Sequence, residues 1–148
     1  MMPLWQLFYH IVWSTKGRAP ILQPDVEPLV YDLVRSKATG LGAVVYALNG
    51  MPDHVHLVVA IPPKIAVAQF IGQVKGVAAA RFNKREGCLT PLYWQSEYAV
   101  FSLDSKRLSN HVAYVNAQKV HHRQRTTIPL LERTATRGHK CRTLQNDA

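Results

Sequence analysis

Two histidines separated by one residue are candidate ligands for a metal ion. His54 and His56 flank Val55. If this segment is a β-strand, alternate side chains lie on the same face, so the two imidazoles project together. Neighbouring imidazoles can chelate a metal. The same spacing also suits two partly exposed histidines that bind nothing, and spacing alone leaves both interpretations open.

A tyrosine and a glutamine further along the chain form the second candidate group. Tyr114 and Gln118 are four residues apart, so on a helix they lie one above the other. Three histidines fall near the same stripe, namely His111, His121 and His122. Taken alone, Tyr114 fits a packed aromatic ring whose hydroxyl reaches water. Only its combination with the histidine pair suggests chemistry.

The charge of the chain favours a polyanionic partner. The 148 residues include 18 Lys and Arg against 9 Asp and Glu, which gives a formal net charge of +9. Excess positive charge attracts polyanions, and phosphate contacts supply most non-specific affinity for nucleic acid. In residues 105–143 the only acidic residue is Glu132. Nucleic acid is therefore favoured, with a basic balance that merely maintains solubility as the alternative.

Composition excludes several other classes of protein. The chain has the length of one domain, and 47% hydrophobic residues can form a core. Its two cysteines, Cys88 and Cys141, form no CxxC pair, which argues against a disulfide framework or a cysteine zinc site. No stretch reaches the roughly 18 apolar residues of a membrane span, and the N-terminus lacks the charged region of a signal peptide. We expect a cytoplasmic protein without a membrane partner.

Apolar periodicity predicts the elements that would position these residues. The predicted strands cover residues 4–13, 43–48, 54–61 and 94–101. The predicted helices run from about residue 25 to just before Gly40, from 67 to about 86, and from 105 to about 123. The order β-α-β-β-α-β followed by a helix predicts an α+β, ferredoxin-like antiparallel sheet with helices on one face and the other face free for ligands.

Periodicity also suggests how the chain divides. We expect one domain over residues 1–125. The residues after Thr126 are polar and basic without a sustained period. A loosely ordered basic tail is therefore predicted over residues 126–148.

Taken together, the motifs resemble one family closely. The matching segments are MPDHVHLV at residues 51–58, PPK at 62–64, KG at 75–76, YWQ at 93–95, YVNAQ at 114–118 and HH at 121–122. The chain resembles the single-tyrosine HUH transposases, small proteins of bacterial insertion sequences that act on single-stranded DNA, and their relatives associated with repetitive palindromes. The resemblance extends from Phe8 to about Arg123.

This resemblance implies a mechanism and a set of site residues. Tyr114 would attack a DNA phosphodiester to give a 5′-phosphotyrosine and a free 3′-hydroxyl. His54, His56 and Gln118 would bind the divalent metal, Mg²⁺ or Mn²⁺. A phenol with a pKa of about 10 is a poor nucleophile at neutral pH, so a nearby cation is needed. Because Gln118 is neutral, we expect only modest metal affinity without DNA.

The resemblance also implies partners. The substrate would be single-stranded DNA with hairpin ends, and the protein would act as a homodimer. We expect DNA contacts from basic residues on the second and last predicted helices. These candidates are Lys75, Arg81, Lys84, Arg85, Arg123 and Arg125. For each of them a solvated surface charge is the alternative.

Two other classes of function compete with this one. A non-catalytic nucleic-acid-binding module can share the βαββαβ order and stack bases on its open sheet. The predicted strands lack the aromatic and glycine-rich signature of that module. A small zinc hydrolase that uses His54, His56 and a third histidine is the other rival, although no HExxH motif supports it.

Overall fold

The structure is a computed structural model that describes residues 3–134. The strands are β1 (Phe8–Ser14), β2 (Val44–Met51), β3 (His54–Ala60) and β4 (Ala99–Leu103). The helices are α1 (Glu27–Gly40), α2 (Val67–Lys84), α3 (Ser105–Asn116) and α4 (Gln118–Gln124), with short 3-10 turns at Lys16–Arg18 and Pro129–Glu132. This order confirms the predicted α+β, ferredoxin-like fold with additional C-terminal helices.

The four strands form one antiparallel sheet in the order β2-β3-β1-β4. Strand β3 lies inside the sheet, and all seven of its residues are buried. Its central residue pairs bring His56 opposite Val12 on β1 and opposite Asn49 on β2. Hydrogen bonding on both sides therefore fixes the position of this strand.

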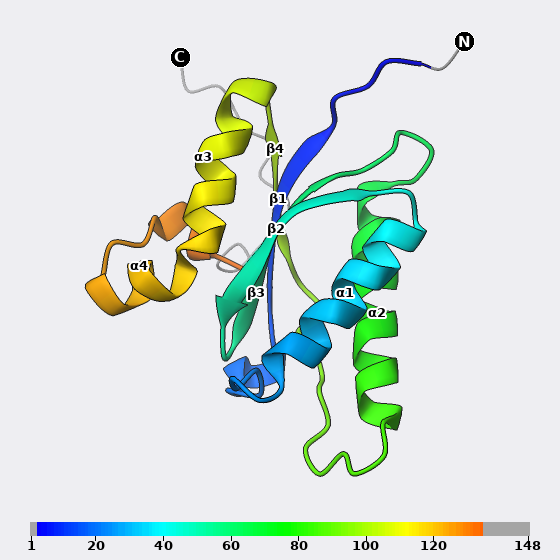
Figure 1. Cartoon of the computed structure of the whole chain (residues 1–148), viewed down its shortest axis with the longest axis vertical. Coiled ribbons are helices and arrows are strands. Elements are labelled where there is room, and N and C mark those ends of the chain that lie inside the picture. The colour runs from blue at the N-terminus through cyan, green and yellow to red at the C-terminus, as the bar shows by residue number, and fades with distance from the viewer. Residues whose placement is uncertain (1–2, 135–148) are drawn as a thin grey trace.

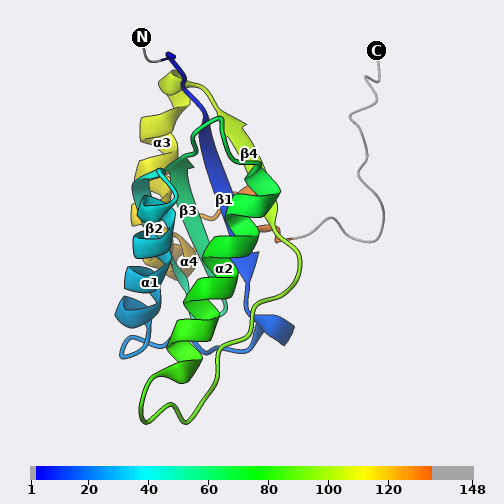
Figure 2. The same ribbon diagram turned by 90° about the vertical axis from the view of Figure 1, so that its right-hand side faces the viewer.

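Helices cover both faces of the sheet. Figure 1 shows α1 and α2 on one side of the strands and α3 and α4 on the other, and Figure 2 shows α1 and α2 lying across the sheet. The larger core fills the α1 and α2 side, where Val55, Leu57 and Val59 of β3 point. A smaller cluster on the opposite side contains Val58 and Val115.

The prediction that one face of the sheet is free of helices is therefore wrong. The apolar arc of the last helices packs on that face, with Val112 and Leu108 beside the buried Val115. Burying this arc is favourable because it removes apolar area from water. An open sheet on which bases could stack, as the binding-module alternative requires, is not available where these helices lie.

Two strands are shorter than predicted. Strand β1 begins at Phe8 instead of residue 4, because Phe8 pairs with Ala60 and Leu103 at the last register positions of both neighbours. Strand β4 begins at Ala99 instead of residue 94. Residue 94 forms only an isolated bridge, with the residue that follows β1, and Lys75 Nζ donates to the carbonyl oxygens of residues 95 and 97 before β4 begins.

The start of the predicted tail is ordered. Pro129–Glu132 forms a 3-10 turn, and Leu131 is buried in the smaller cluster. The expectation of loose order is therefore wrong for this part, because Leu131 finds an apolar contact that local periodicity does not reveal. The rest of the predicted tail, residues 135–148, lies outside the described residues. The domain boundary at residue 125 stays a prediction.

Among the helices of residues 3–134, none combines the length and the apolar character that crossing a membrane requires.

A substitution at Gly50 tests how tightly the β2–β3 hairpin is packed next to His54. A Cβ atom on Gly50 would lie 2.1 Å from the backbone oxygen of His54, so the backbone must shift to accept it. We predict that Gly50→Ala lowers the free energy of unfolding by about 1–3 kcal/mol, as overpacking does, in urea denaturation. The control is Gly72→Ala on α2, where the new Cβ meets open space.

The control variant should be neutral or stabilised by up to about 1 kcal/mol, because alanine favours a helix. Equal stability of the two variants would contradict the tight packing inferred for the hairpin.

Candidate active site

His54 and His56 lie side by side on β3. Their ring centroids are 5.1 Å apart, and both side chains are buried. Each ring turns its Nε2 atom toward the carboxylate of Glu132, which lies 3.0 Å from His54 and 3.2 Å from His56. The alternation of the strand therefore brings the two imidazoles together, as the sequence predicts.

Tyr114 and Gln118 reach the same place from the other side. The Tyr114 hydroxyl donates to Glu132 Oε1 and accepts the backbone N–H of Ile128 at 3.0 Å. Gln118 Nε2 donates to Glu132 Oε1 at 2.9 Å, and its Oε1 atom lies 3.4 Å from His54 Nε2. The structure thus brings together all four residues that the resemblance names.

The helix that carries these two residues is broken between them. The sequence predicts one helix to about residue 123, whereas α3 ends at Asn116 and α4 begins at Gln118, with Ala117 at φ −97° and ψ 15°. Asn49 Nδ2 donates to the carbonyl oxygens of Val115 and Asn116, at 3.1 and 3.2 Å. This side chain from β2 satisfies carbonyls at the end of α3.

Glu132 is the central residue that the sequence prediction missed. Its carboxylate contacts both β3 histidines, Tyr114 and Gln118, and its Oε2 atom lies 3.2 Å from His122 Nε2. The only sequence signal was its status as the single acidic residue in a basic stretch. It lies beyond the last periodic segment, so no pattern placed it near the histidines.

These residues include a ligand set that fits a divalent metal. One ligand atom each from His54, His56 and Glu132 lies within 4.8 Å of the other two. Two imidazole nitrogens and a carboxylate oxygen form a mixed donor set. The carboxylate adds the kind of ligand that manganese and magnesium prefer, beside imidazoles that suit softer metals.

Two further side chains contact the Nδ1 atoms of the two histidine rings. His54 Nδ1 lies 2.7 Å from Asp53 Oδ1. His56 Nδ1 lies 2.8 Å from Nε2 of His10, a fully buried residue of β1. Burial lowers the pKa of His10 to about 3, and the charges of His56 and His111 act in the same direction. His10 is therefore a neutral imidazole at neutral pH.

At Glu132 and His54, burial and polar contacts shift the pKa values in opposite directions. Burial raises the pKa of Glu132, but hydrogen bonds from His54 and His56 outweigh it and hold the pKa well below the ordinary carboxyl value. Burial lowers the pKa of His54, and its hydrogen bonds to Glu132 and Asp53 reverse this, so the pKa is raised. Glu132 is thus a carboxylate at neutral pH.

The Tyr114 phenol is protonated at neutral pH. Burial raises its pKa to about 12, and the hydrogen bond to Glu132 adds to this effect. A phenol in this state is a weak nucleophile, so chemistry at its oxygen needs an acceptor for the proton and a compensating positive charge.

A cleft gives access to the cluster. It has a volume of about 390 Å³, and its lining includes Arg18, Asp53, His54, His122 and Glu132. The Arg18 guanidinium lies 3.4 Å from the carboxylate of Asp53. The cleft therefore joins a positively charged group at the surface to the buried histidines.

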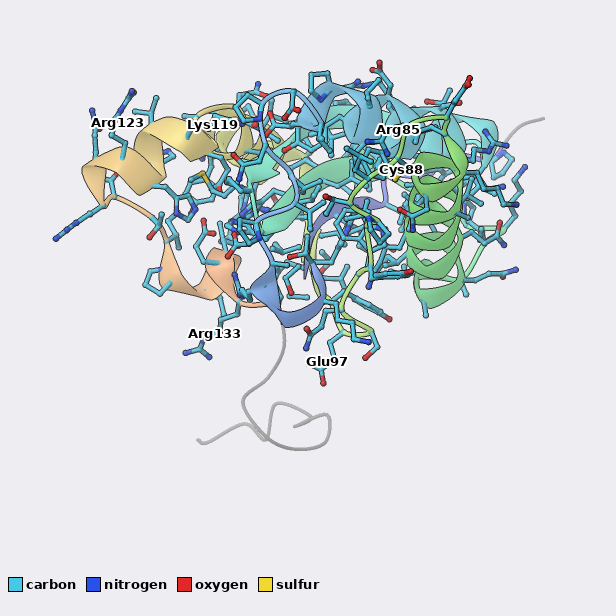
Figure 3. All side chains as sticks on the ribbon, turned by 90° about the horizontal axis from the view of Figure 1, so that it is seen from below. Arg85, Cys88, Glu97, Lys119, Arg123 and Arg133 are labelled. Atoms are coloured by element: carbon cyan, nitrogen blue, oxygen red, sulfur yellow. The ribbon has the colours of Figure 1, made fainter. Side chains whose placement is uncertain are left out.

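The basic residues predicted to bind DNA fall in two separate places. Figure 3 shows Arg123 and Arg85 at opposite sides of the molecule, on α4 and at the end of α2. Arg123 and Arg125 are exposed in the layer that carries Tyr114. The candidates of the second helix, Lys75, Arg81, Lys84 and Arg85, belong to α2 or its C-terminal cap on the other side of the sheet.

Two of the α2 candidates have structural contacts of their own. Lys75 is buried, and its ammonium group donates to two backbone carbonyls of the loop before β4. The Arg85 guanidinium lies 3.6 Å from the ring centroid of Phe82 and donates to the backbone oxygen of the same residue. DNA contacts by any of the six residues stay predictions.

The fold and site define a basic α+β protein in which a tyrosine lies beside a histidine and carboxylate cluster. Residues 3–118 match the family model described as IS200-like transposase. The chain belongs to this family, and it is a transposase, an enzyme that cleaves DNA.

Named relatives agree with this assignment. The chain is 28% identical over 120 residues to the ISDra2 transposase TnpA of Deinococcus radiodurans, covering 78% of this chain and 86% of the relative. It is 27% identical over 94 residues to the transposase of insertion sequence IS200 of Salmonella typhimurium, covering 64% of this chain and 62% of the relative.

Solved structures share the fold. A crystal structure described as a transposase from Deinococcus radiodurans superposes with a TM-score of 0.65 at 28% identity, covering 80% of this chain and 95% of that one. A REP-associated tyrosine transposase bound to a REP hairpin superposes with a TM-score of 0.61 at 14% identity, covering 82% and 74%. At that identity the second match shows the fold alone.

The carboxylate of Glu132 provides a test of the cluster without metal. We predict that Glu132→Gln lowers the free energy of unfolding by about 1–3 kcal/mol at pH 7 with a chelator present, because buried donors lose an acceptor. Urea denaturation measures the change. Glu27→Gln is the matched control, since both glutamate side chains are 16% exposed and Glu27 forms an ion pair with the exposed Lys119, outside the cluster.

The control should lose less than about 1 kcal/mol, as surface ion pairs do. A Glu132→Gln protein as stable as the wild type would mean that the carboxylate does not hold the cluster together.

Proposed function

We propose that this transposase cleaves and rejoins single-stranded DNA at the ends of an insertion sequence through a 5′-phosphotyrosine intermediate, with Tyr114 as the nucleophile. The observation that carries the proposal is the shared carboxylate of Glu132. The same group accepts the hydrogen bond of the Tyr114 hydroxyl and contacts the Nε2 atoms of His54 and His56. Nucleophile and ligand atoms are therefore adjacent.

The reaction exchanges one ester for another. The Tyr114 oxygen forms a bond to phosphorus, and the bond from phosphorus to the 3′-oxygen breaks. The phenol loses one proton, and the released 3′-oxygen takes up one proton to become the 3′-hydroxyl. The reverse reaction rejoins a strand, so the step needs no external energy source. Before attack, the Tyr114 hydroxyl keeps this proton and donates it in a hydrogen bond to Glu132 Oε1.

We propose that His54, His56 and Glu132 hold a divalent metal, Mg²⁺ or Mn²⁺, with Gln118 as a further ligand. Bound there, the cation would supply positive charge next to the phenol and the scissile phosphate. The expectation of only modest metal affinity without DNA was based on the neutral ligand Gln118. The negative charge of Glu132 changes this expectation, because a carboxylate ligand should increase metal affinity in the free protein.

The complete set of residues comes from one chain. Tyr114 lies against the histidines of its own β3, through Glu132 of the same chain. This arrangement supports attack in cis. A homodimer is proposed from the family resemblance, and in that case each subunit would carry a full site.

The proposed substrate is a single strand with a hairpin. The resemblance to the single-tyrosine transposases supports this substrate, and the net positive charge suits a polyanion. Arg123 and Arg125 are the favoured contacts, because they are exposed on the layer that carries the site. The cleft beside His54 and Arg18 is the proposed path for the scissile phosphate.

A covalent adduct tests the nucleophile. We predict that wild-type protein, mixed with Mn²⁺ and single-stranded oligonucleotides that carry the palindromes flanking its gene, forms a protein–DNA adduct that survives denaturing electrophoresis. Tyr114→Phe should form none, because it lacks the attacking oxygen. Tyr93→Phe is the matched control, since Tyr93 is 60% exposed and none of the hydrogen bonds among the described residues joins its hydroxyl to the cluster.

The Tyr93 variant should form the adduct at the wild-type rate. An adduct formed by the Tyr114→Phe protein would show that another residue is the nucleophile. Hairpin binding by the wild type without any adduct would favour a non-catalytic binding protein.

Metal affinity tests the ligand set. We predict that His54→Ala and Glu132→Gln each weaken Mn²⁺ binding at least about tenfold, since the first removes a ligand and the second removes the negative charge of one. Electron paramagnetic resonance of free Mn²⁺ measures the affinity. His121→Ala is the control, because its ring stacks on Tyr114 and its Nδ1 atom contacts Thr126, and neither of these residues is a proposed metal ligand.

The control protein should bind Mn²⁺ as the wild type does. Wild-type affinity in both ligand variants would overturn the metal site while leaving the assignment to the family intact.

A further inference from the structure

Three imidazoles form a continuous hydrogen-bonded row that begins at the proposed metal site. His56 Nδ1 lies 2.8 Å from His10 Nε2, and His10 Nδ1 lies 2.8 Å from His111 Nδ1. The three residues come from β3, β1 and α3, so the row runs along one face of the sheet from β3 to the neighbouring β1 and continues into the helical layer on that face. His10 is fully buried, while His111 is only partly buried.

Each bond of the row needs one N–H and one lone pair. A neutral imidazole has one of each, so the proton position on one ring fixes the proton positions on its neighbours. The row can therefore run in only two directions. In one, every N–H points toward Glu132, and in the other every N–H points away from it.

The two directions differ in what His56 can do. With its proton on Nε2, His56 donates to Glu132 Oε2 at 3.2 Å and cannot ligate a metal through that atom. With its proton on Nδ1, it donates to His10 Nε2 and leaves the Nε2 lone pair directed into the cluster. His10 then donates from its own Nδ1 to His111 Nδ1.

His54 achieves the same result by a different contact. Its Nδ1 atom faces the carboxylate of Asp53 at 2.7 Å, and a carboxylate can only accept. Metal-bound histidines commonly donate their second ring N–H to such a partner. Among the described hydrogen bonds, no carboxylate contacts Nδ1 of His56. The imidazole of His10 contacts this atom instead.

We propose that His10 is a positioning residue for the metal ligand His56, and that the row His56, His10 and His111 holds His56 in the tautomer with Nε2 free for the metal. The proposal rests on the metal site described under the proposed function. His10 acts through His56 and contacts neither metal nor DNA. The chain thus orients its two histidine ligands with unlike groups, a carboxylate for His54 and a neutral imidazole for His56.

Two substitutions at one position test the role. His10→Leu removes the acceptor, whereas His10→Gln retains one, because the glutamine Oε1 atom falls near the position of the imidazole Nε2. We expect His10→Leu to weaken Mn²⁺ binding about 10- to 100-fold, the usual effect of losing such a partner. His10→Gln should bind within a few-fold of the wild type. A purely structural role would make the two variants differ in stability and not in metal affinity.

Affinity is measured by electron paramagnetic resonance of Mn²⁺ on the full-length chain, and thermal unfolding in chelator reports the stability of each variant. A folded His10→Leu protein that binds Mn²⁺ as tightly as the wild type would overturn the inference. His56→Ala separates the two proposals. If His56→Ala leaves Mn²⁺ affinity unchanged, both the proposed metal site and the inference about His10 are wrong. If His56→Ala weakens Mn²⁺ binding and His10→Leu does not, only the inference about His10 is wrong.

The wild-type protein supplies a test that needs no variant. Long-range ¹H–¹⁵N spectra of the imidazole nitrogens report which nitrogen carries the proton. In the Mg²⁺-loaded protein we expect the protons of His56 and His10 on Nδ1. A Mg²⁺-loaded protein in which His56 keeps its proton on Nε2 would overturn the proposal, even if His10→Leu fails to fold.

Discussion

The packing of α3 and α4 against the sheet face that carries His54 and His56 determines everything else at the site. Val58 and Val115 are fully buried where these layers meet, and such side chains each contribute about 1.5–3 kcal/mol when buried. Asn49 reinforces the contact by donating to the end of α3. Without this docking, Tyr114 would be a surface residue far from any metal ligand.

The docking also creates a polar centre between apolar clusters, and such a centre is costly unless each group finds a partner. Glu132 resolves the problem, because its two oxygens contact polar groups on β3, α3 and α4. It reaches them from a short turn that Leu131 anchors. A residue outside every regular helix and strand therefore joins the elements that carry the chemistry.

The sequence predicted what depends on local periodicity. A strand period of two placed His54 and His56 on one face, and helical spacing related Tyr114 to Gln118. Each of these follows from the geometry of a single element, which tertiary contacts modified only slightly.

The rest depends on contacts between distant residues. At the break near Ala117 the end of α3 is bound by Asn49, about seventy positions earlier, and the segment before β4 is bound by the ammonium group of Lys75. His10 lies within the predicted strand over residues 4–13, but its hydrogen-bond partners lie 46 and 101 residues away, so local periodicity could not identify them. Glu132 had no periodic context at all, so its place beside the histidines was not predictable.

Diffraction from crystals grown with Mn²⁺, recorded at the manganese absorption edge, tests the central claim most directly. The account predicts one anomalous peak within bonding distance of His54 Nε2, His56 Nε2 and a Glu132 oxygen, with the Tyr114 hydroxyl adjacent to it. An anomalous peak at another position, or a Tyr114 ring directed away from the two imidazoles, would contradict this account.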